Sequence, residues 1–182
     1  MSPEKDKLRI DSPLRYPGKL AIDTEGGRLF ISDSNHHRIV VTDLDGKFID
    51  TIGTGRIGLA DGGYDEAQFF RLQGLAFHKG NLYVADAENH ALRVVDTKAK
   101  TVRTLAGNGT QGRDYKGGKG GREQPISTPW DVLFEDGQVF IAMAGTHQIW
   151  SYDMKKRIAK NYSGNGSEQN LNRTDRLLAA WA

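Results

Sequence analysis

The chain has no cysteine among its 182 residues. Disulfide bonds, thiolate metal sites and cysteine nucleophiles are therefore excluded within it. No apolar run approaches the roughly 18 residues of a membrane-spanning helix. The first ten residues are charged and lack the apolar core of a secretion signal. The charges nearly balance, at +2, so composition gives no reason to expect a nucleic-acid or membrane partner.

Helical periodicity is missing as well. No long segment repeats its apolar residues every 3.6 positions, and residues 64–70 and 173–182 allow at most short helical turns. The remaining composition, 37% hydrophobic and 26% charged, is ordinary for a globular domain with one core. The sequence therefore favours an all-β fold.

One stretch of the sequence occurs three times. LFISDSNHHRIVVTDLD at 29–45 returns as LYVADAENHALRVVDTK from Leu82 and as VFIAMAGTHQIWSYDMK from Val139. Its histidines, His37, His90 and His147, are 53 and 57 residues apart. Three copies at such a period indicate a repeat architecture.

Each copy predicts four short strands separated by turns. In the first copy these are GKLAID, LFIS, IVVTD and FIDTIG, with Asp45-Gly46 as a hairpin turn. LFIS and its counterparts are apolar on both faces, so each sheet should be covered on both sides. Small sheets stacked face to face around an axis meet this need, and that arrangement is a β-propeller.

We therefore predict a partial, three-blade β-propeller of four-stranded antiparallel sheets in residues 14–182, after a tail or linker at 1–13. The expected blades span about 17–55, 72–109 and 128–166, with glycine-rich links between them and a stub of a fourth at 167–182. Each repeat histidine should lie between the second and third strands of its blade.

With these turns identified, the chain resembles the NHL repeat family, six-bladed propellers named for an Asn-His-Leu motif. The motif reads HHRI at 36–39, NHAL at 89–92 and THQI at 146–149. PGKLAID, ADAENHALR, LAGNG, STPWDV and IAMAGTHQIW resemble NHL-repeat-containing proteins in which a thioredoxin-like domain precedes the propeller. The resemblance spans residues 14–170 and implies about half of a six-bladed ring.

The same resemblance implies two open flanks. Residues 175–182 resemble the link before the second repeat, and the sequence stops before the strand that would follow. The flanking sheets should expose apolar rows such as Leu29/Ile31 or Phe140. The expected partners are the remaining blades of the same polypeptide or a second copy, and the isolated chain should aggregate or fold loosely.

Repetition also bears on metal and acid–base chemistry. Histidines and paired carboxylates are typical of metal sites and catalytic pairs. One copy per blade, however, places these side chains on different sheets. We therefore interpret five residues as structural, with the carboxylates accepting turn N–H groups: Asp33, His37, Asp86, His90 and His147. We expect no catalytic residue, no tightly bound metal and no cofactor.

Ligand-binding candidates lie where the copies differ. The first strand of a propeller blade lies nearest the axis, where ligands usually meet the channel mouth. Lys19 and the pair Trp130-Asp131 stand at the starts of such strands, and Met143 replaces the repeated aspartate in the third copy. These four residues are the predicted ligand-binding positions.

The glycine-rich links do not predict a nucleotide site. G-x-G-x-x-G occurs at 53–58 and again at 107–112, and no helix-forming sequence follows the second copy, so both are interpreted as inter-blade turns. The second link is basic, with Arg113, Lys116, Lys119 and Arg122, but it holds one aromatic residue, Tyr115. It predicts an exposed loop with at most weak, salt-dependent RNA binding.

The sequence thus favours a non-enzymatic binding or protein-interaction scaffold, part of a larger thioredoxin-like/NHL-repeat protein. One alternative is the scaffold part of a thiol-disulfide oxidoreductase, whose cysteines would lie elsewhere. The other is a metal-dependent six-bladed hydrolase or lyase. For that class the inner-strand positions Lys19, Gly74 and Asp131 offer a poor set of cation ligands.

Overall fold

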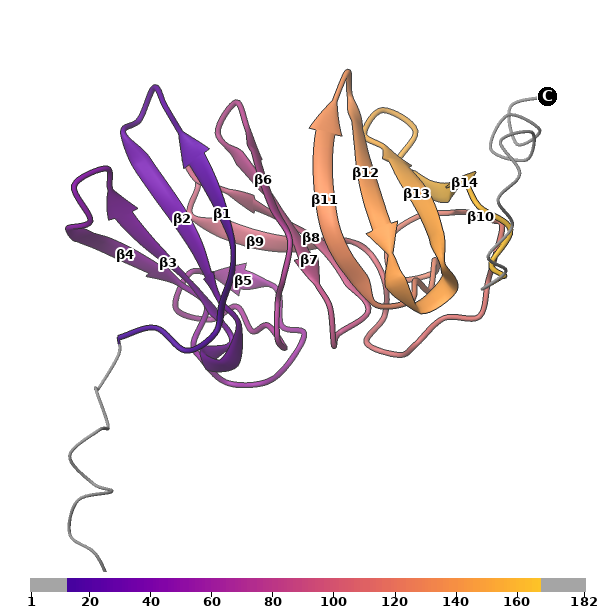
Figure 1. Cartoon of the computed structure of the whole chain (residues 1–182), viewed down its shortest axis with the longest axis horizontal. Helices are drawn as coiled ribbons and strands as arrows, with labels where there is room; N and C mark the ends of the chain where they lie inside the picture. Colours follow the sequence, from indigo (N-terminus) through magenta and orange to yellow (C-terminus); the bar gives the residue numbers. More distant parts are fainter. Residues whose placement is uncertain (1–12, 168–182) are drawn as a thin grey trace, which may run out of the picture.

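The computed structural model describes residues 13–167, which form three antiparallel sheets arranged in sequence order (Figure 1). Blade 1 comprises β1 (Pro17–Asp23), β2 (Arg28–Asp33), β3 (Arg38–Asp43) and β4 (Phe48–Ile52). Blade 2 comprises β6 (Leu75–His78), β7 (Asn81–Asp86), β8 (Ala91–Asp96) and β9 (Thr101–Ala106). Blade 3 comprises β11 (Pro129–Glu135), β12 (Gln138–Met143), β13 (Gln148–Asp153) and β14 (Ile158–Ser163). The fold is the expected three-blade propeller.

Two apolar cores lie between the blades. The first joins Phe30 and Ile39 of blade 1 to Leu82 and Val84 of blade 2. The second joins the opposite face of blade 2, including Tyr83, to residues of blade 3 such as Trp150. Alternate residues of β7 therefore enter different cores, because successive side chains of a strand point to opposite faces. This explains why LYVA is apolar throughout.

The links differ from the expected loops. Each adds a short fifth strand to the blade that follows it: β5 (Gly62–Gly63) pairs with β9, and β10 (Gly117–Lys119) pairs with β14. The first link also sends Ala67 and Phe69 into the core between blades 1 and 2. Glycines in the links allow close backbone approach, since a side chain at Gly120 would collide with the carbonyl of Arg157.

The repeat histidines lie where the sequence placed them, between the second and third strands of each blade. His37 and His147 end the 3-10 turns η2 (Ser34–His36) and η3 (Ala144–Thr146), and His90 occupies the equivalent turn of blade 2. All three have left-handed backbones, with φ of 54°, 47° and 51° for His37, His90 and His147. This conformation is uncommon for a residue with a Cβ, and it turns the chain from one strand into the next.

The outer faces of blades 1 and 3 are partly apolar, as predicted. Leu20 and Ile22 are exposed on blade 1, as are Leu133 and Ile149 on blade 3. The rows named from sequence, Leu29/Ile31 and Phe140, are half-buried. The predicted stub at 167–182 and the tail at 1–13 lie almost wholly outside the described residues. No helix in the described part of the chain is long and apolar enough to span a membrane.

Candidate functional site

The starts of the three innermost strands form the candidate site, called here the inner-strand mouth. The arrows of β1 and β11 point the same way with β6 between them (Figure 1), and β6 contacts both. A left-handed residue precedes each of these strands at Tyr16, Arg71 and Thr128, with φ of 56°, 47° and 46°. This repeated conformation gives the three inner strands the same entry geometry.

An ion pair spans the mouth from blade 1 to blade 3. The Lys19 ammonium lies 2.5 Å from the Asp131 carboxylate, and each side chain is 41% exposed. The equivalent position of blade 2, between them, is Gly74. A Cβ at Gly74 would lie 2.5 Å from the Asp131 Cα, so only glycine leaves room for this close approach. Lys19 and Asp131, two predicted ligand-binding residues, therefore do lie together.

The other two candidates differ in accessibility. Trp130 is 54% exposed, although core packing is the more common role for tryptophan. Met143 is 1% exposed, and its sulfur lies 3.3 Å from the backbone nitrogen of Ser127. Both residues border a shallow, mainly apolar hollow of about 440 Å³ on the open flank of blade 3. Trp130 can touch a partner directly, whereas Met143 supports the wall.

The repeated aspartates bind the backbone of a neighbouring segment as well as side chains of their own turn. Asp33 accepts a hydrogen bond from the N–H of Arg15 at 2.6 Å, and Asp86 accepts one from Phe70 at 2.8 Å. Both donors lie just before the first strand of the same blade, the position that Ser127 occupies in blade 3. The Met143 sulfur thus replaces a carboxylate as acceptor. The backbone donors to these aspartates therefore come from outside the turn, not from the turn N–H groups that the sequence predicted.

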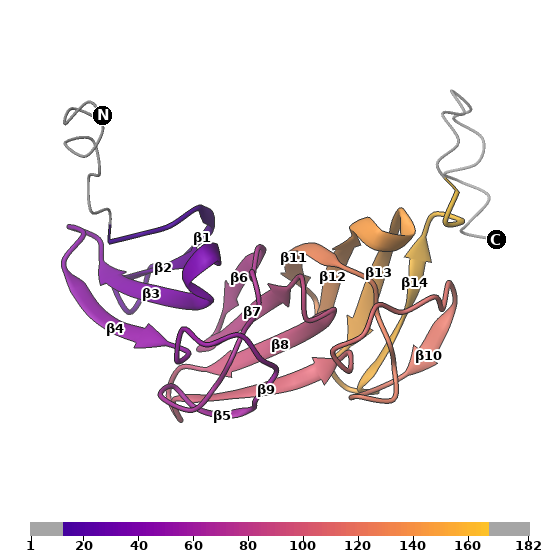
Figure 2. The same cartoon turned by 90° about the horizontal axis from the view of Figure 1, so that it is seen from below.

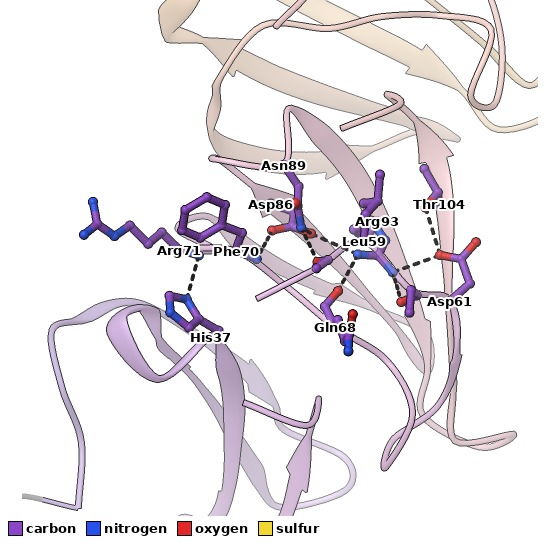
Figure 3. Close-up of polar contacts among 12 residues, drawn as sticks. His37, Leu59, Asp61, Gln68, Phe70, Arg71, Asp86, Asn89, Arg93 and Thr104 are labelled. Atoms are coloured by element: carbon purple, nitrogen blue, oxygen red, sulfur yellow. Dashed lines mark hydrogen bonds and ion pairs between the residues drawn. The ribbon is translucent and has the colours of Figure 1, made fainter. Parts of the chain in front are cut away.

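Asp86 belongs to a buried polar network that orders the first link (Figure 3). The Arg93 Nη1 atom, one of the two terminal guanidinium nitrogens, donates to Asp86 and to the Gln68 carbonyl, both at 2.9 Å. The other donates to the Ala60 carbonyl at 2.7 Å and to Asp61 at 2.8 Å. The guanidinium, itself fully buried, thereby ties three points of the link to blade 2.

Burial and the neighbouring polar groups shift the pKa values of the two aspartates in opposite directions. Burial raises the pKa of Asp86 to about 6, while Arg93 and the Asn89 amide favour its ionised form. Asp61 sits nearer the surface, where the Thr104 hydroxyl and Arg93 lower its pKa against the effect of burial. The network is a structural clamp, because its charged groups face protein atoms and one another.

Sequence analysis missed Arg93. Its counterparts in the other copies are Val40 and Trp150, so a charged residue in an apolar strand position was the available signal. Blade 3 replaces both members of the Asp86–Arg93 pair with Met143 and Trp150, and Trp150 is buried there. Blade 1 keeps the aspartate without this arginine, and Asp33 pairs with Arg38 instead.

The repeat histidines connect successive blades. The N–H of Arg71 donates to His37 Nδ1 at 3.2 Å (Figure 3), and the N–H of Thr128 donates to His90 Nδ1 at 3.0 Å. Each donor is the left-handed residue that starts the next blade. An imidazole that accepts at Nδ1 must carry its proton on Nε2 and be neutral. The two histidines are thus inter-blade latches that protonation would open.

We expect protonation of these latches to destabilise the fold below about pH 6.5. Burial lowers the pKa of His37, with Arg71 and His36 acting in the same direction and Asp33 opposing them. Burial also lowers the pKa of His90, opposed by Glu88. The unfolded chain then binds protons first, so this stabilisation is complete above pH 6.5 and is lost as the pH falls through the folded pKa values.

The measurement is the difference in unfolding free energy between the natural chain and a His37→Asn, His90→Asn variant, from pH 7.5 to 5. Asparagine can accept the same N–H groups but does not titrate. Asp86 changes the stability with pH in the opposite direction, because its pKa is raised in the folded state. Its stabilising effect is complete below pH 3.8 and is lost as the pH rises through about 6. It is present in both chains and cancels. Parallel pH curves would show that the latches do not titrate as described.

The described residues contain no group of three or more histidine or acidic side chains that could hold a metal ion. His37 and His90 face backbone N–H groups of the following blade, and Asp33 and Asp86 face N–H groups before their own first strand. Chemically, the site therefore offers an exposed aromatic ring, an accessible ion pair and a shallow apolar hollow.

Comparison with known proteins agrees with the fold and the repeats. The NHL repeat family model matches residues 14–41. The protein SUPPRESSOR OF QUENCHING 1, chloroplastic, of Arabidopsis thaliana is 55% identical over 174 residues, covering 93% of this chain and 16% of that protein. NHL repeat-containing protein 2 of Gallus gallus is 44% identical over 187 residues, covering 92% of this chain and 26% of that protein. The chain thus spans about a quarter or less of these relatives.

Solved structures are similar in fold at low identity. A protein of unknown function from Bacteroides thetaiotaomicron superimposes with a TM-score of 0.61 at 23% identity, covering 78% of this chain and 34% of the other. The WD40 repeats of RRP9 superimpose with a TM-score of 0.55 at 13% identity, covering 80% and 36%. These likenesses concern the fold alone.

Proposed function

This chain is a three-blade stretch of NHL-repeat β-propeller, and from that premise we propose that it is a non-enzymatic scaffold holding a protein partner at the inner-strand mouth. The observation that carries the proposal is Trp130, 54% exposed at the start of an inner strand. Tryptophan is one of the residue types enriched among the energetic anchors of protein interfaces. The fold buries Trp150 between blades 2 and 3, whereas Trp130 borders the open flank at the start of the inner strand, where its ring is accessible in these three blades.

The surroundings of Trp130 fit an interface anchor. The next residue, Asp131, forms the cross-blade ion pair with Lys19, which offers a partner one cation and one anion beside the ring. The hollow bordered by Trp130 and Ile149 supplies adjacent apolar surface. An aromatic anchor beside polar groups that remain solvated is the usual composition of a non-obligate interface.

The proposal extends to the whole protein. The relatives are several times longer than this chain, so we propose that the scaffold works as one part of a larger polypeptide whose further blades continue the ring. If that polypeptide performs thiol-disulfide chemistry, as the thioredoxin-like branch suggests, its cysteines must come from outside these 182 residues. The role of this part is then positioning.

Site-specific photo-cross-linking tests the proposal. A photoreactive phenylalanine at position 130 in cells is expected to trap a defined protein partner. The same group at Phe48, which is 61% exposed on blade 1, serves as the matched control. An added Asp131→Lys change, which places two cations together in the mouth, should reduce the specific cross-link at least fivefold. Equal cross-linking at 130 and 48 would show that the mouth is not a docking face.

A further inference from the structure

The outer edge of blade 3 carries an unbalanced group of cations. They are the basic edge: Lys116, Lys119, Lys155, Lys156, Arg157 and Lys160, all exposed. The segments 114–119 and 153–160 that carry them contain two acidic residues, Asp114 and Asp153. Six cations against two carboxylates leave an excess of four, although the whole chain has a net charge of +2. The rest of the chain is therefore net negative.

Backbone pairing brings these distant segments together. β10 and β14 are adjacent in the sheet, with β10 at its outer edge (Figure 2), and Lys160 lies opposite Gly117 in their register. The N–H of Asn161 donates to the Lys116 carbonyl at 2.9 Å. The second link, which joins blades 2 and 3, therefore lies along the β14 edge, and its cations add to those of the β13–β14 turn. Sequence alone separated these two basic groups by about 40 positions.

The two acidic residues do not neutralise the group. Asp114 accepts the N–H groups of Lys116 and Gly117, and Asp153 accepts those of Lys155 and Lys156. Of the six cations, Lys156 alone lies within 4 Å of a carboxylate in the described structure, 3.9 Å from Asp153. Cations elsewhere are paired more closely, as in Arg28–Asp23 at 2.6 Å and Lys100–Asp50 at 2.9 Å. The basic edge thus lacks anions that the rest of the fold supplies internally.

We propose that the basic edge binds an acidic segment of a protein partner. Lysine on an edge strand also discourages strand-to-strand aggregation, but three-residue β10 needs few charges for that purpose. Nucleic acid fits less well, because single-strand readers stack bases on several aromatic rings. The second link and the β13–β14 turn contain one aromatic residue, Tyr115, whose ring lies against Gly166. Complementary charge would speed the encounter and orient the partner.

This surface is distinct from the inner-strand mouth, because the strand order of blade 3 places β11 and β10 at opposite edges of the sheet. The inference therefore goes beyond the proposed function, and either one can fail alone. A bipartite partner could engage both, with the acidic segment supplying long-range attraction and the mouth supplying specificity.

The test uses the 182-residue chain immobilised at low density and a labelled dodecaglutamate peptide as probe. Lys155→Glu, Lys156→Glu, Lys160→Glu is compared with Lys47→Glu, Lys79→Glu, Lys98→Glu, three exposed lysines on blades 1 and 2. Both triple variants change the net charge by the same amount. We expect at least a tenfold loss of affinity for the first and less than threefold for the second. A triple Lys→Gln variant at 155, 156 and 160 should give an intermediate loss without charge reversal.

Equal losses in the two triple variants would overturn the proposal, because binding would then follow net charge rather than this edge. A single-stranded RNA dodecamer or an anionic lipid vesicle that binds more tightly than the peptide through the same lysines would also overturn it. Those results would reassign the basic edge to nucleic acid or to a membrane surface. Mouth variants such as Trp130→Ala should leave peptide affinity unchanged.

Discussion

Replacing Arg93 with methionine is expected to lower the free energy of unfolding by about 3–5 kcal/mol, which is typical when one partner of a buried ion pair is removed. The change leaves Asp86 fully buried without its cation. It also removes the donors to the carbonyls of Gln68 and Ala60, so the first link loses its clamp. Urea unfolding at submicromolar chain concentration, followed by tryptophan fluorescence, measures the loss.

Two variants decide how the loss arises. Lys100→Met removes an ion pair whose lysine is largely exposed, and it should cost about 0–1 kcal/mol. Adding Asp86→Met to Arg93→Met removes both buried charges, as Met143 and Trp150 do in blade 3, and it should restore part of the stability. If Arg93→Met costs no more than Lys100→Met, the network contributes little to folding.

The isolated chain is expected to self-associate through its open flanks. Leu133 is 63% exposed and Ile149 40% exposed, and both border a further hollow on blade 3 with half-buried Phe140. Contiguous apolar surface of this kind promotes association in water. Sedimentation velocity at about 10 μM is expected to show a broad distribution of species larger than a monomer.

Charging one flank should reverse this behaviour. Leu133→Glu with Ile149→Glu is expected to raise the monomer fraction at least tenfold, because association would then bury unpaired carboxylates. Leu44→Glu is the control, since Leu44 is 56% exposed but lies in the β3–β4 turn. A natural chain that sediments as a sharp monomer would show that three blades suffice. A sharp dimer would point to pairing of two half-propellers.

The architecture could be predicted from sequence because the same four-strand pattern occurs three times along the chain. Positions 37, 90 and 147 adopt the same turn conformation in each blade. The middle copy, LYVA, packs on both sides, as its apolar pattern predicts. The links were not predictable in the same way. Their order comes from side chains such as Arg93, which belong to another segment, and from close backbone contacts at glycine.

The candidate site was only partly predictable for the same physical reason. Lys19 and Asp131 are 112 positions apart, and their contact depends on the curvature of the blades and on the absence of a side chain at Gly74. Trp130 could be placed at an inner strand, but its exposure depends on what covers the flank. Met143 was predicted from the repeat pattern to be a ligand-binding residue, whereas the fold buries it beside the backbone N–H of Ser127.

The ion pair across Gly74 also changes how cooperativity should be described. In a straight array of repeats, each unit interacts only with its immediate neighbours, and stability is a sum of nearest-neighbour terms. Lys19 and Asp131 join units that are two apart. Bending the array around an axis therefore introduces a second-neighbour coupling at the inner rim, where the units converge. Local unfolding of blade 1 would be felt at the inner strand of blade 3 even while blade 2 stays folded.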